Sequence, residues 1–212
     1  MYKLTIACMT FLFAAGSSAL GQKWEFGVVG GASIYKSQSV SSGGASGDVG
    51  FNSNFAVGAM IGNTVSDRFG GEVRYLYEKN DLRVNASGAA TMSGESHAMH
   101  YDLLIYAAPR GAKVRPFVSV GGGAKQYRGT GTEVAYQPGS NLALLTRASE
   151  WKGLVTAGGG VKIAASKHLS LRAEFRTYLT AFPTKVIAPS RNVSFGGWLY
   201  NFVPLFGMTI TY

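Results

Sequence analysis

An alternation of apolar and polar residues is clearest at the end of the chain. Large apolar residues occupy the even-numbered positions from Trp198 to Tyr212, apart from Pro204, whereas the odd-numbered positions include Asn201 and Thr209. Successive side chains of a β-strand point to opposite faces, so this period of two predicts a strand with one continuous apolar face. Proline cannot donate a hydrogen bond to a strand ladder, and we therefore expect a bulge or another irregularity at Pro204.

Seven earlier segments show the same alternation, and each is expected to be a strand with an apolar outer face. Aromatic residues often stand near the ends of these segments, where the girdles of a membrane barrel lie. The pattern predicts an all-β fold, a transmembrane antiparallel up-and-down β-barrel of eight strands. The residues expected to face outward are Trp24, Phe26, Val28, Ala32 and Ile34; Phe51, Phe55, Val57, Ala59 and Ile61; Val73, Tyr75 and Tyr77; Met99, Tyr101, Leu103 and Ile105; Val118 and Val120; Trp151, Val155, Val161 and Ile163; and Leu169, Leu171, Phe175 and Leu179.

The connections between these segments alternate in length. Residues 63–68, 109–115 and 165–168 are short connections, whereas residues 36–50, 84–95, 129–150 and 181–196 are long ones. Short periplasmic turns and long external loops are typical of outer-membrane barrels, and an even number of strands places both termini on the short-turn side. Within the longest connection, residues 142–145 are expected to extend the strands or to fold onto the rim.

The first 21 residues have the pattern of a secretory signal peptide. Lys3 precedes an apolar run over residues 4–15, and small residues follow it up to Gly21. This run is shorter than the roughly 20 residues of a membrane-spanning helix. We expect cleavage after Gly21, so that residues 1–21 form the signal peptide and residues 22–212 form one barrel domain. Cleavage removes Cys8, the only cysteine, and so excludes disulfides from the mature chain.

The composition agrees with a membrane barrel. The chain has 29 glycines, 12% aromatic and 15% charged residues, and no apolar run after the signal is long enough for a spanning helix. A chain of this kind can span lipid only as a closed barrel, and the alternative is a soluble β-sandwich. The net charge of +9 favours anionic neighbours, outer-membrane lipids and lipopolysaccharide, over nucleic acid. Glycine pairs and triplets recur inside the expected strands, where they fit tight bends of a small barrel.

Charged residues on the opposite face of the expected strands predict a network inside the barrel. The third and seventh of eight strands face each other across the lumen, so the charges of one are expected to pair with those of the other. Eight strands enclose a space that side chains can fill, and buried charges persist only when they are paired. We therefore expect a lumen plugged by side chains, with a narrow small-solute channel as the alternative. The expected lumen charge network is Glu72, Arg74, Glu78, Asp102, Arg172, Glu174 and Arg176, and His100, Lys125 and Lys162 also face inward.

Two stretches resemble the OmpA/OmpX-like outer-membrane β-barrel family. The terminal GMTITY looks like the signal read by the barrel-assembly machinery, and GGGVKIAASKHLSLRAEFRTY looks like a penultimate hairpin of that family. The resemblance implies a location in the bacterial outer membrane and assembly by that machinery. It does not fix a function, because barrels of this size serve as anchors, adhesion factors, pores and lipid enzymes. The residues of the expected assembly signal are Gly207, Met208, Ile210 and Tyr212.

A catalytic alternative rests on His168 and Ser170. They resemble the His-x-Ser dyad of outer-membrane lipid A deacylases, and Glu174 is nearby. The dyad falls at a short turn, however, whereas lipid A lies in the outer leaflet. His97 and His100 fall on opposite faces of one strand and are not expected to share a metal. We therefore expect no catalytic residues, metal or cofactor, and a structural or surface-interaction role, with a lipid A-modifying enzyme as the last alternative; the sequence does not indicate a ligand or an oligomeric state.

Overall fold

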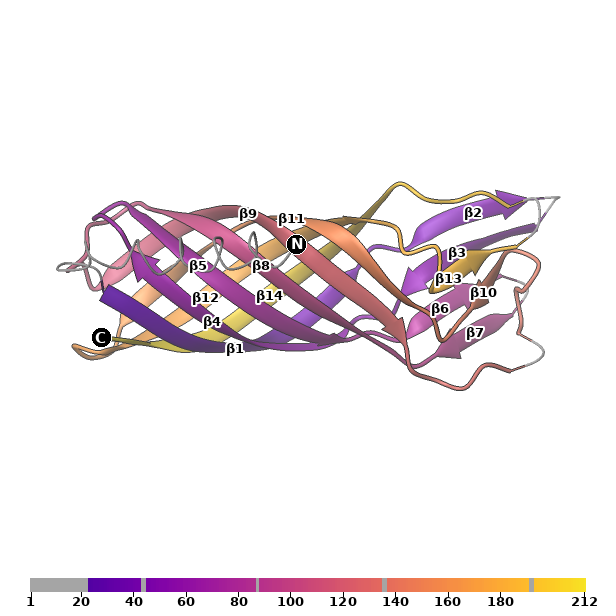
Figure 1. The fold of residues 1–212 in the computed structure, drawn as a ribbon, viewed down its shortest axis with the longest axis horizontal. Helices are drawn as coiled ribbons and strands as arrows, with labels where there is room; N and C mark the ends of the chain where they lie inside the picture. The colour runs from indigo at the N-terminus through magenta and orange to yellow at the C-terminus, as the bar shows by residue number, and fades with distance from the viewer. Residues whose placement is uncertain (1–22, 43–44, 87, 135–136, 191–192) are drawn as a thin grey trace, which may run out of the picture.

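The computed structural model describes residues 23–42, 45–86, 88–134, 137–190 and 193–212. Eight long strands form a closed antiparallel barrel (Figure 1), which confirms the predicted fold. The predicted signal peptide and the start of the mature chain at Gln22 lie outside the described residues and stay predictions. No helix in the described part of the chain is long and apolar enough to cross a membrane.

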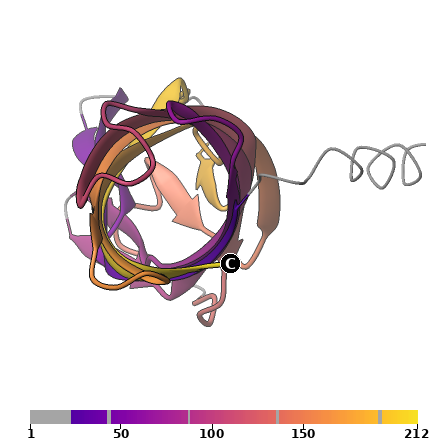
Figure 2. The same ribbon diagram turned by 90° about the vertical axis from the view of Figure 1, so that its left-hand side faces the viewer.

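The barrel strands follow one another around the ring in chain order, and the last strand closes on the first. Short turns join their ends on the side where the chain terminates, and Figure 2 looks into this short-turn end. The long connections all lie at the opposite end, as the sequence predicts. The barrel strands are β1 (Lys23–Tyr35), β4 (Asn54–Thr64), β5 (Phe69–Lys79), β8 (Gly94–Tyr106), β9 (Val114–Gly129), β11 (Ser149–Ala164), β12 (Leu169–Ala181) and β14 (Trp198–Thr211).

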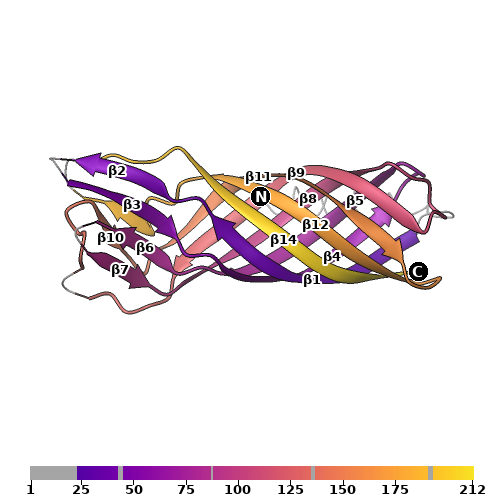
Figure 3. The same ribbon diagram turned by 180° about the vertical axis from the view of Figure 1, so that it is seen from behind.

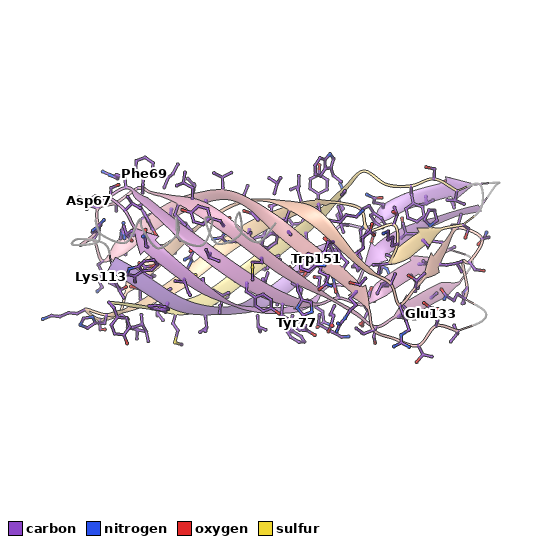
Figure 4. The ribbon with its side chains drawn as sticks, viewed as in Figure 1. Asp67, Phe69, Tyr77, Lys113, Glu133 and Trp151 are labelled. Atoms are coloured by element: carbon purple, nitrogen blue, oxygen red, sulfur yellow. The ribbon has the colours of Figure 1, made fainter. Side chains whose placement is uncertain are left out.

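The outer surface of the barrel is apolar. Outward side chains such as Phe206, Val118 and Leu171 are at least half exposed, while their strand neighbours face the interior. Figure 4 shows the aromatic side chain of Phe69 near the short-turn end, and those of Tyr77 and Trp151 near the other end of the barrel. An apolar belt of this kind is stable in lipid and not in water. The belt and the closed barrel together exclude the β-sandwich alternative.

Beyond the barrel, the long connections form further strands where the sequence predicts long loops, and residues 143–145, expected to extend the strands or to fold onto the rim, form a strand that pairs with residues 187–189. A four-stranded sheet and a two-stranded sheet extend past the barrel end (Figures 1 and 3). We call these strands the outer β layer. They enclose an apolar core that includes Val49, Leu82 and Leu145, so burial of apolar side chains stabilises them. The layer consists of β2 (Gln38–Ser42), β3 (Ala45–Phe51), β6 (Leu82–Asn85), β7 (Ala89–Met92), β10 (Ala143–Leu145) and β13 (Ile187–Pro189).

Phe51 corrects the predicted second strand. It was expected to face lipid with Phe55, but it ends β3 and is buried in the core of the outer β layer. Its ring lies 5.1 Å from that of Tyr35 and 5.3 Å from that of Tyr127, measured between centroids. The period of two continues across the break between β3 and β4, so it cannot show that the chain has left the membrane.

Pro204 interrupts one ladder without adding a residue. The pairing of β14 with β12 passes through Phe175 opposite Pro204 in constant register. On the other side, pairing with β1 stops at Gly31 opposite Leu205 and resumes at Ile34 opposite Phe202, again in the same register. The irregularity is therefore a local loss of strand pairing, where the proline has no N–H to donate, and the expected bulge is absent.

The close approach of β1 to Pro204 makes a prediction about a pair of glycines. A Cβ on the inward Gly31 would lie 2.0 Å from the carbonyl oxygen of Pro204, whereas one on the outward Gly30 would come no closer than 3.9 Å to its neighbours. Gly31→Ala should lower the free energy of unfolding by about 1–3 kcal/mol, as overpacking does. Gly30→Ala, the matched control, should stay within about 0.5 kcal/mol. Urea unfolding in detergent micelles measures both, and equal effects would contradict the argument.

Candidate functional site

The charged side chains of the lumen come from strands that face one another across the barrel. Alternate residues of β5 and β12 point inward, so Glu72 and Arg74 on one strand meet Arg172, Glu174 and Arg176 on the other. Asp102 joins them from β8. We call these six residues the central ion cluster. The structure brings together six of the seven residues named from the sequence as a network.

Glu72 is the carboxylate on which three guanidinium groups converge. Its Oε2 atom lies 2.7 Å from Nη1 of Arg172, and its Oε1 atom lies 2.6 Å from Nη2 of Arg176. Nη2 of Arg74 approaches the same Oε1 atom at 2.8 Å. Each of these contacts is a charge-assisted hydrogen bond, the stronger kind in proteins.

Glu174 forms ion pairs with the same three arginines. Its Oε1 atom lies 2.5 Å from Nη1 of Arg74, and its Oε2 atom lies 2.9 Å from Nη2 of Arg172 and 3.0 Å from Nε of Arg176. With Asp102, the central ion cluster contains three carboxylates and three guanidinium groups. The cluster is neutral as a whole, which is the condition under which buried charges persist.

Asp102 completes the cluster through Arg176. Nη1 of Arg176 donates to Oδ2 of Asp102, and the hydroxyl of Thr156 donates to Oδ1. His100 lies beside it, with Nδ1 at 3.0 Å from Oδ2 of Asp102 and Nε2 at 3.2 Å from the hydroxyl of Tyr178. The side chains of Asp102, Arg176 and His100 are completely buried. The lumen at this level is filled by protein groups.

Glu78 does not join this cluster, contrary to the prediction that it pairs with Arg172 and Arg176. It lies six residues beyond Glu72 on β5, and therefore closer to the outer end of the barrel. Its partner is Lys125 of β9, with Nζ 2.8 Å from Oε2 of Glu78. The period of two places both residues inside the lumen but does not give their height, so it does not identify the partner.

The Glu78–Lys125 pair lies within its own polar shell. The Oε2 atom of Glu78 accepts hydrogen bonds from the hydroxyl of Tyr35 at 2.5 Å and that of Ser33 at 2.8 Å. It also accepts one from the side-chain amide of Asn201 at 2.8 Å. Neither charged side chain has any exposed surface. Lys125 is thus a functional candidate that was placed in the lumen from the sequence but left out of the expected network.

Apolar layers separate the two ionic levels from each other and from the short-turn end. Leu76 lies between Arg74 and Glu78 on β5 and packs with Val29, Leu154 and other buried residues. On the short-turn side, Leu104, Tyr106 and Phe117 form a smaller buried cluster, and the guanidinium carbon of Arg172 lies 4.6 Å from the ring centre of Phe117. From the short-turn end outward, the lumen therefore alternates apolar and ionic layers.

The structure does not bring His168, Ser170 and Glu174 together as a catalytic site. His168 is the last residue of the short turn, and its Nδ1 atom lies 3.1 Å from the carbonyl oxygen of Thr211. Ser170 lines a cavity at the short-turn end, whereas Glu174 is held by three arginines in the central ion cluster. No bond between His168 and Ser170 is seen, and the dyad lies at the end of the barrel away from the outer β layer.

His97 and His100 lie on opposite faces of β8, as the alternation predicts. Nδ1 of His97 lies 2.7 Å from the hydroxyl of Tyr75 on the outer surface, while His100 is in the lumen. Within the described ranges, no group of three or more His, Cys, Asp or Glu residues is arranged to hold a metal ion.

The expected assembly signal lies at the C-terminal end of the chain, in the last residues of β14 and in Tyr212 after it. Met208, Ile210 and Tyr212 face outward and are exposed, and the ring of Tyr212 lies edge-on to that of Phe26, 6.4 Å away. Gly207 faces inward, where a Cβ would meet the carbonyl oxygen of Val28 at 2.2 Å. These positions are compatible with an exposed apolar signal on the last strand, and recognition by the assembly machinery stays a proposal.

The closed barrel, apolar belt and ion-filled interior define a class, the small transmembrane β-barrels of bacterial outer membranes. The sequence matches the outer membrane protein beta-barrel domain over residues 5–201, and the chain therefore belongs to this family. It is accordingly an outer-membrane protein. No curated protein matches the chain.

Solved structures of outer-membrane barrels are similar to this chain at low sequence identity. Neisserial surface protein A (NspA) is 12% identical, with a TM-score of 0.54 over 91% of this chain and 99% of that one. The N-terminal β-barrel domain of OprF from Pseudomonas aeruginosa is 13% identical, with a TM-score of 0.47 over 90% and 97% of the two chains. Ail of Yersinia pestis, in complex with the heparin analogue sucrose octasulfate, is 8% identical, with a TM-score of 0.48 over 90% and 99%.

Proposed function

We propose that this protein is a non-enzymatic, non-conducting barrel that presents the outer β layer for interactions at the cell surface. The observation that carries the proposal is that the four long connections fold into strands with their own apolar core. Long flexible loops would not need such a core, whereas a rigid interaction surface does, because ordering it before binding lowers the entropic cost of association.

The chemistry of the outer β layer supports this role. Leu144 lies on β10 of this layer and is 41% exposed, and Val134 lies in the connection between β9 and β10 and is 57% exposed. Val134 lines a cavity of about 250 Å³ together with Thr91 and Leu145 of the layer and with Pro138 of the same connection. Exposed apolar side chains beside a depression are typical of protein interaction sites.

The lumen supports the non-conducting part of the proposal. Arg74, Arg176 and Lys125 are completely buried inside the barrel, and apolar layers lie between the ionic levels. A solute would have to displace paired charges and packed apolar side chains in turn. Each step leaves uncompensated buried groups and is therefore costly.

One experiment with two arms tests the proposal. Cells that display the protein should bind at least one member of a panel of immobilised proteins and polysaccharides better than cells without it. Val134→Ser with Leu144→Ser should reduce that binding several-fold, because a few central apolar residues carry most interface energy. Val65→Ser is the matched control, since Val65 is 60% exposed but lies at a short turn. In the second arm, the purified protein in planar bilayers should add no conductance steps.

Either arm can contradict the proposal. Binding that is unchanged by the two outer substitutions would show that the outer β layer is not the interaction surface. Regular unitary conductance from folded protein would favour the small-solute channel instead. Mass spectrometry of lipid A from expressing cells completes the comparison, because a new acyl pattern would favour the lipid A-modifying enzyme.

A further inference from the structure

The short-turn end of the lumen contains a cavity that the proposed function does not use. Its volume is about 310 Å³, within the range of small-molecule sites. The β8–β9 and β11–β12 turns and the ends of neighbouring barrel strands, including β1 and β14, line it, so it lies at the end opposite to the outer β layer. We call it the vestibule. The cluster of Leu104, Tyr106 and Phe117 lies between it and the central ion cluster.

The vestibule is strongly cationic. Arg110, Arg115, Lys162 and Lys167 line it, and Glu25 is the only carboxylate among its lining residues. Nζ of Lys162 is paired with Oε2 of Glu25, so the one negative charge already has a partner. Even with Asp67 counted beside Arg110, the four cations outnumber the two carboxylates, so the cavity has a positive excess, which attracts and holds anions.

Backbone carbonyls and an aromatic ring orient the two arginines of the vestibule. The guanidinium of Arg115 lies 3.9 Å from the ring centre of Tyr106, and its Nη2 atom donates to the carbonyl of Asp67 at 3.1 Å. Nη2 of Arg110 donates to the carbonyl of Thr64 at 2.6 Å. Nε of Arg110 also lies 3.8 Å from Oδ1 of Asp67, whose side chain is 67% exposed, so this ion pair is long and open to solvent. These contacts orient both guanidinium groups, and oriented guanidinium groups suit the oxygens of phosphate.

The floor and rim of the vestibule add further donors. Lys162 is almost completely buried, and its Nζ atom lies 2.8 Å from the hydroxyl of Tyr106. Lys167 stands at the rim on the turn between β11 and β12 and is exposed. The hydroxyls of Ser170 and Thr211 also line the cavity. A buried cation at the floor, oriented arginines at the wall and an exposed lysine at the rim form a site and not a diffuse patch.

We propose that the vestibule binds a phosphate-bearing anion from the side of the short turns. The ligand places its phosphate between Arg110, Arg115 and Lys167, with hydroxyl groups at its edge. The phosphate belongs either to a soluble phosphate compound or to the headgroup of a phospholipid at the barrel end. This site lies at the opposite end from the proposed surface interaction and does not depend on it.

Calorimetric titration of the full chain in zwitterionic bicelles, with inorganic pyrophosphate as the probe, tests the site. Wild-type protein should show saturable binding of one pyrophosphate. Lys167→Gln and Arg110→Gln should each weaken it about tenfold, the value of one charge-assisted hydrogen bond. Lys167→Arg should keep most of the affinity. Lys113→Gln is the matched control, because Lys113 is exposed on the same turn as Arg110 but does not line the cavity, and it should change the affinity less than about twofold.

The two sources of phosphate are separated by adding phosphatidylglycerol to the bicelles at about 0.15 M salt, where charges beyond about 8 Å are screened. Competition with pyrophosphate supports a lipid headgroup as the ligand, and unchanged affinity supports a soluble phosphate compound. Absence of saturable binding in wild-type protein would overturn the proposal. An equal loss in Lys113→Gln and Lys167→Gln would also overturn it, because the attraction would then come from general surface charge.

Discussion

Arg176→Ala is expected to lower the free energy of unfolding by about 3–5 kcal/mol, the typical cost of removing one partner from a buried ion pair. Arg176 contacts three carboxylates, those of Glu72, Asp102 and Glu174. Alanine would leave these carboxylates with too little positive charge in a space without exposed surface. Guanidinium chloride unfolding in detergent, followed by tryptophan fluorescence, measures the loss, and bilayer conductance shows whether the lumen has also opened.

Arg128→Ala is the matched control for this experiment. Arg128 also pairs with a carboxylate, that of Glu95, but half of its side chain is exposed. An exposed pair of this kind contributes no more than about 1 kcal/mol. A charge swap tests the same cluster. Glu72→Arg alone and Arg172→Glu alone should each lower the free energy of unfolding, and the double variant that combines them should recover part of that loss. If Arg176→Ala unfolds like the parent and does not conduct, the side chains of the lumen are solvated and the plug is wrong.

Lys125→Met should destabilise the barrel by a similar amount, about 3–5 kcal/mol. Methionine fills the space of the lysine stem but leaves the Glu78 carboxylate without a cation, in contact only with neutral donors such as Tyr35 and Asn201. The double variant Lys125→Met with Glu78→Gln should recover most of the loss, since a neutral amide can still bond to those donors. The same unfolding experiment measures both variants.

Lys79→Met is the control for the Lys125 experiment. Lys79 pairs with Asp81 at 3.3 Å near the end of β5, and both side chains are about 30% exposed. Its loss should cost less than about 1 kcal/mol. A double variant that is no more stable than Lys125→Met alone would show that the packing of the lysine stem, and not its charge, is what the barrel requires.

The comparison of the two ionic levels shows what a sequence pattern can and cannot specify. The alternation along β5 predicts that Glu72, Arg74 and Glu78 face inward, and all three do. It does not give the position of a residue along the barrel axis, because that position depends on how the tilted strands are aligned around the ring. The alternation therefore pairs Glu78 with the wrong strand, and it does not pair it with Lys125, which it also places inside.

The sequence by itself determined the eight strands, the face that side chains of the barrel strands occupy and the alternation of short and long connections. These features depend on local periodicity, which is set by the geometry of a strand. Only the tertiary structure decided the partners of the lumen charges, the burial of Phe51, the outer β layer and the vestibule. Each of these depends on contacts between segments far apart in the chain, such as Arg74 with Glu174 or Leu144 opposite Ala188, and no local pattern encodes which distant segments meet.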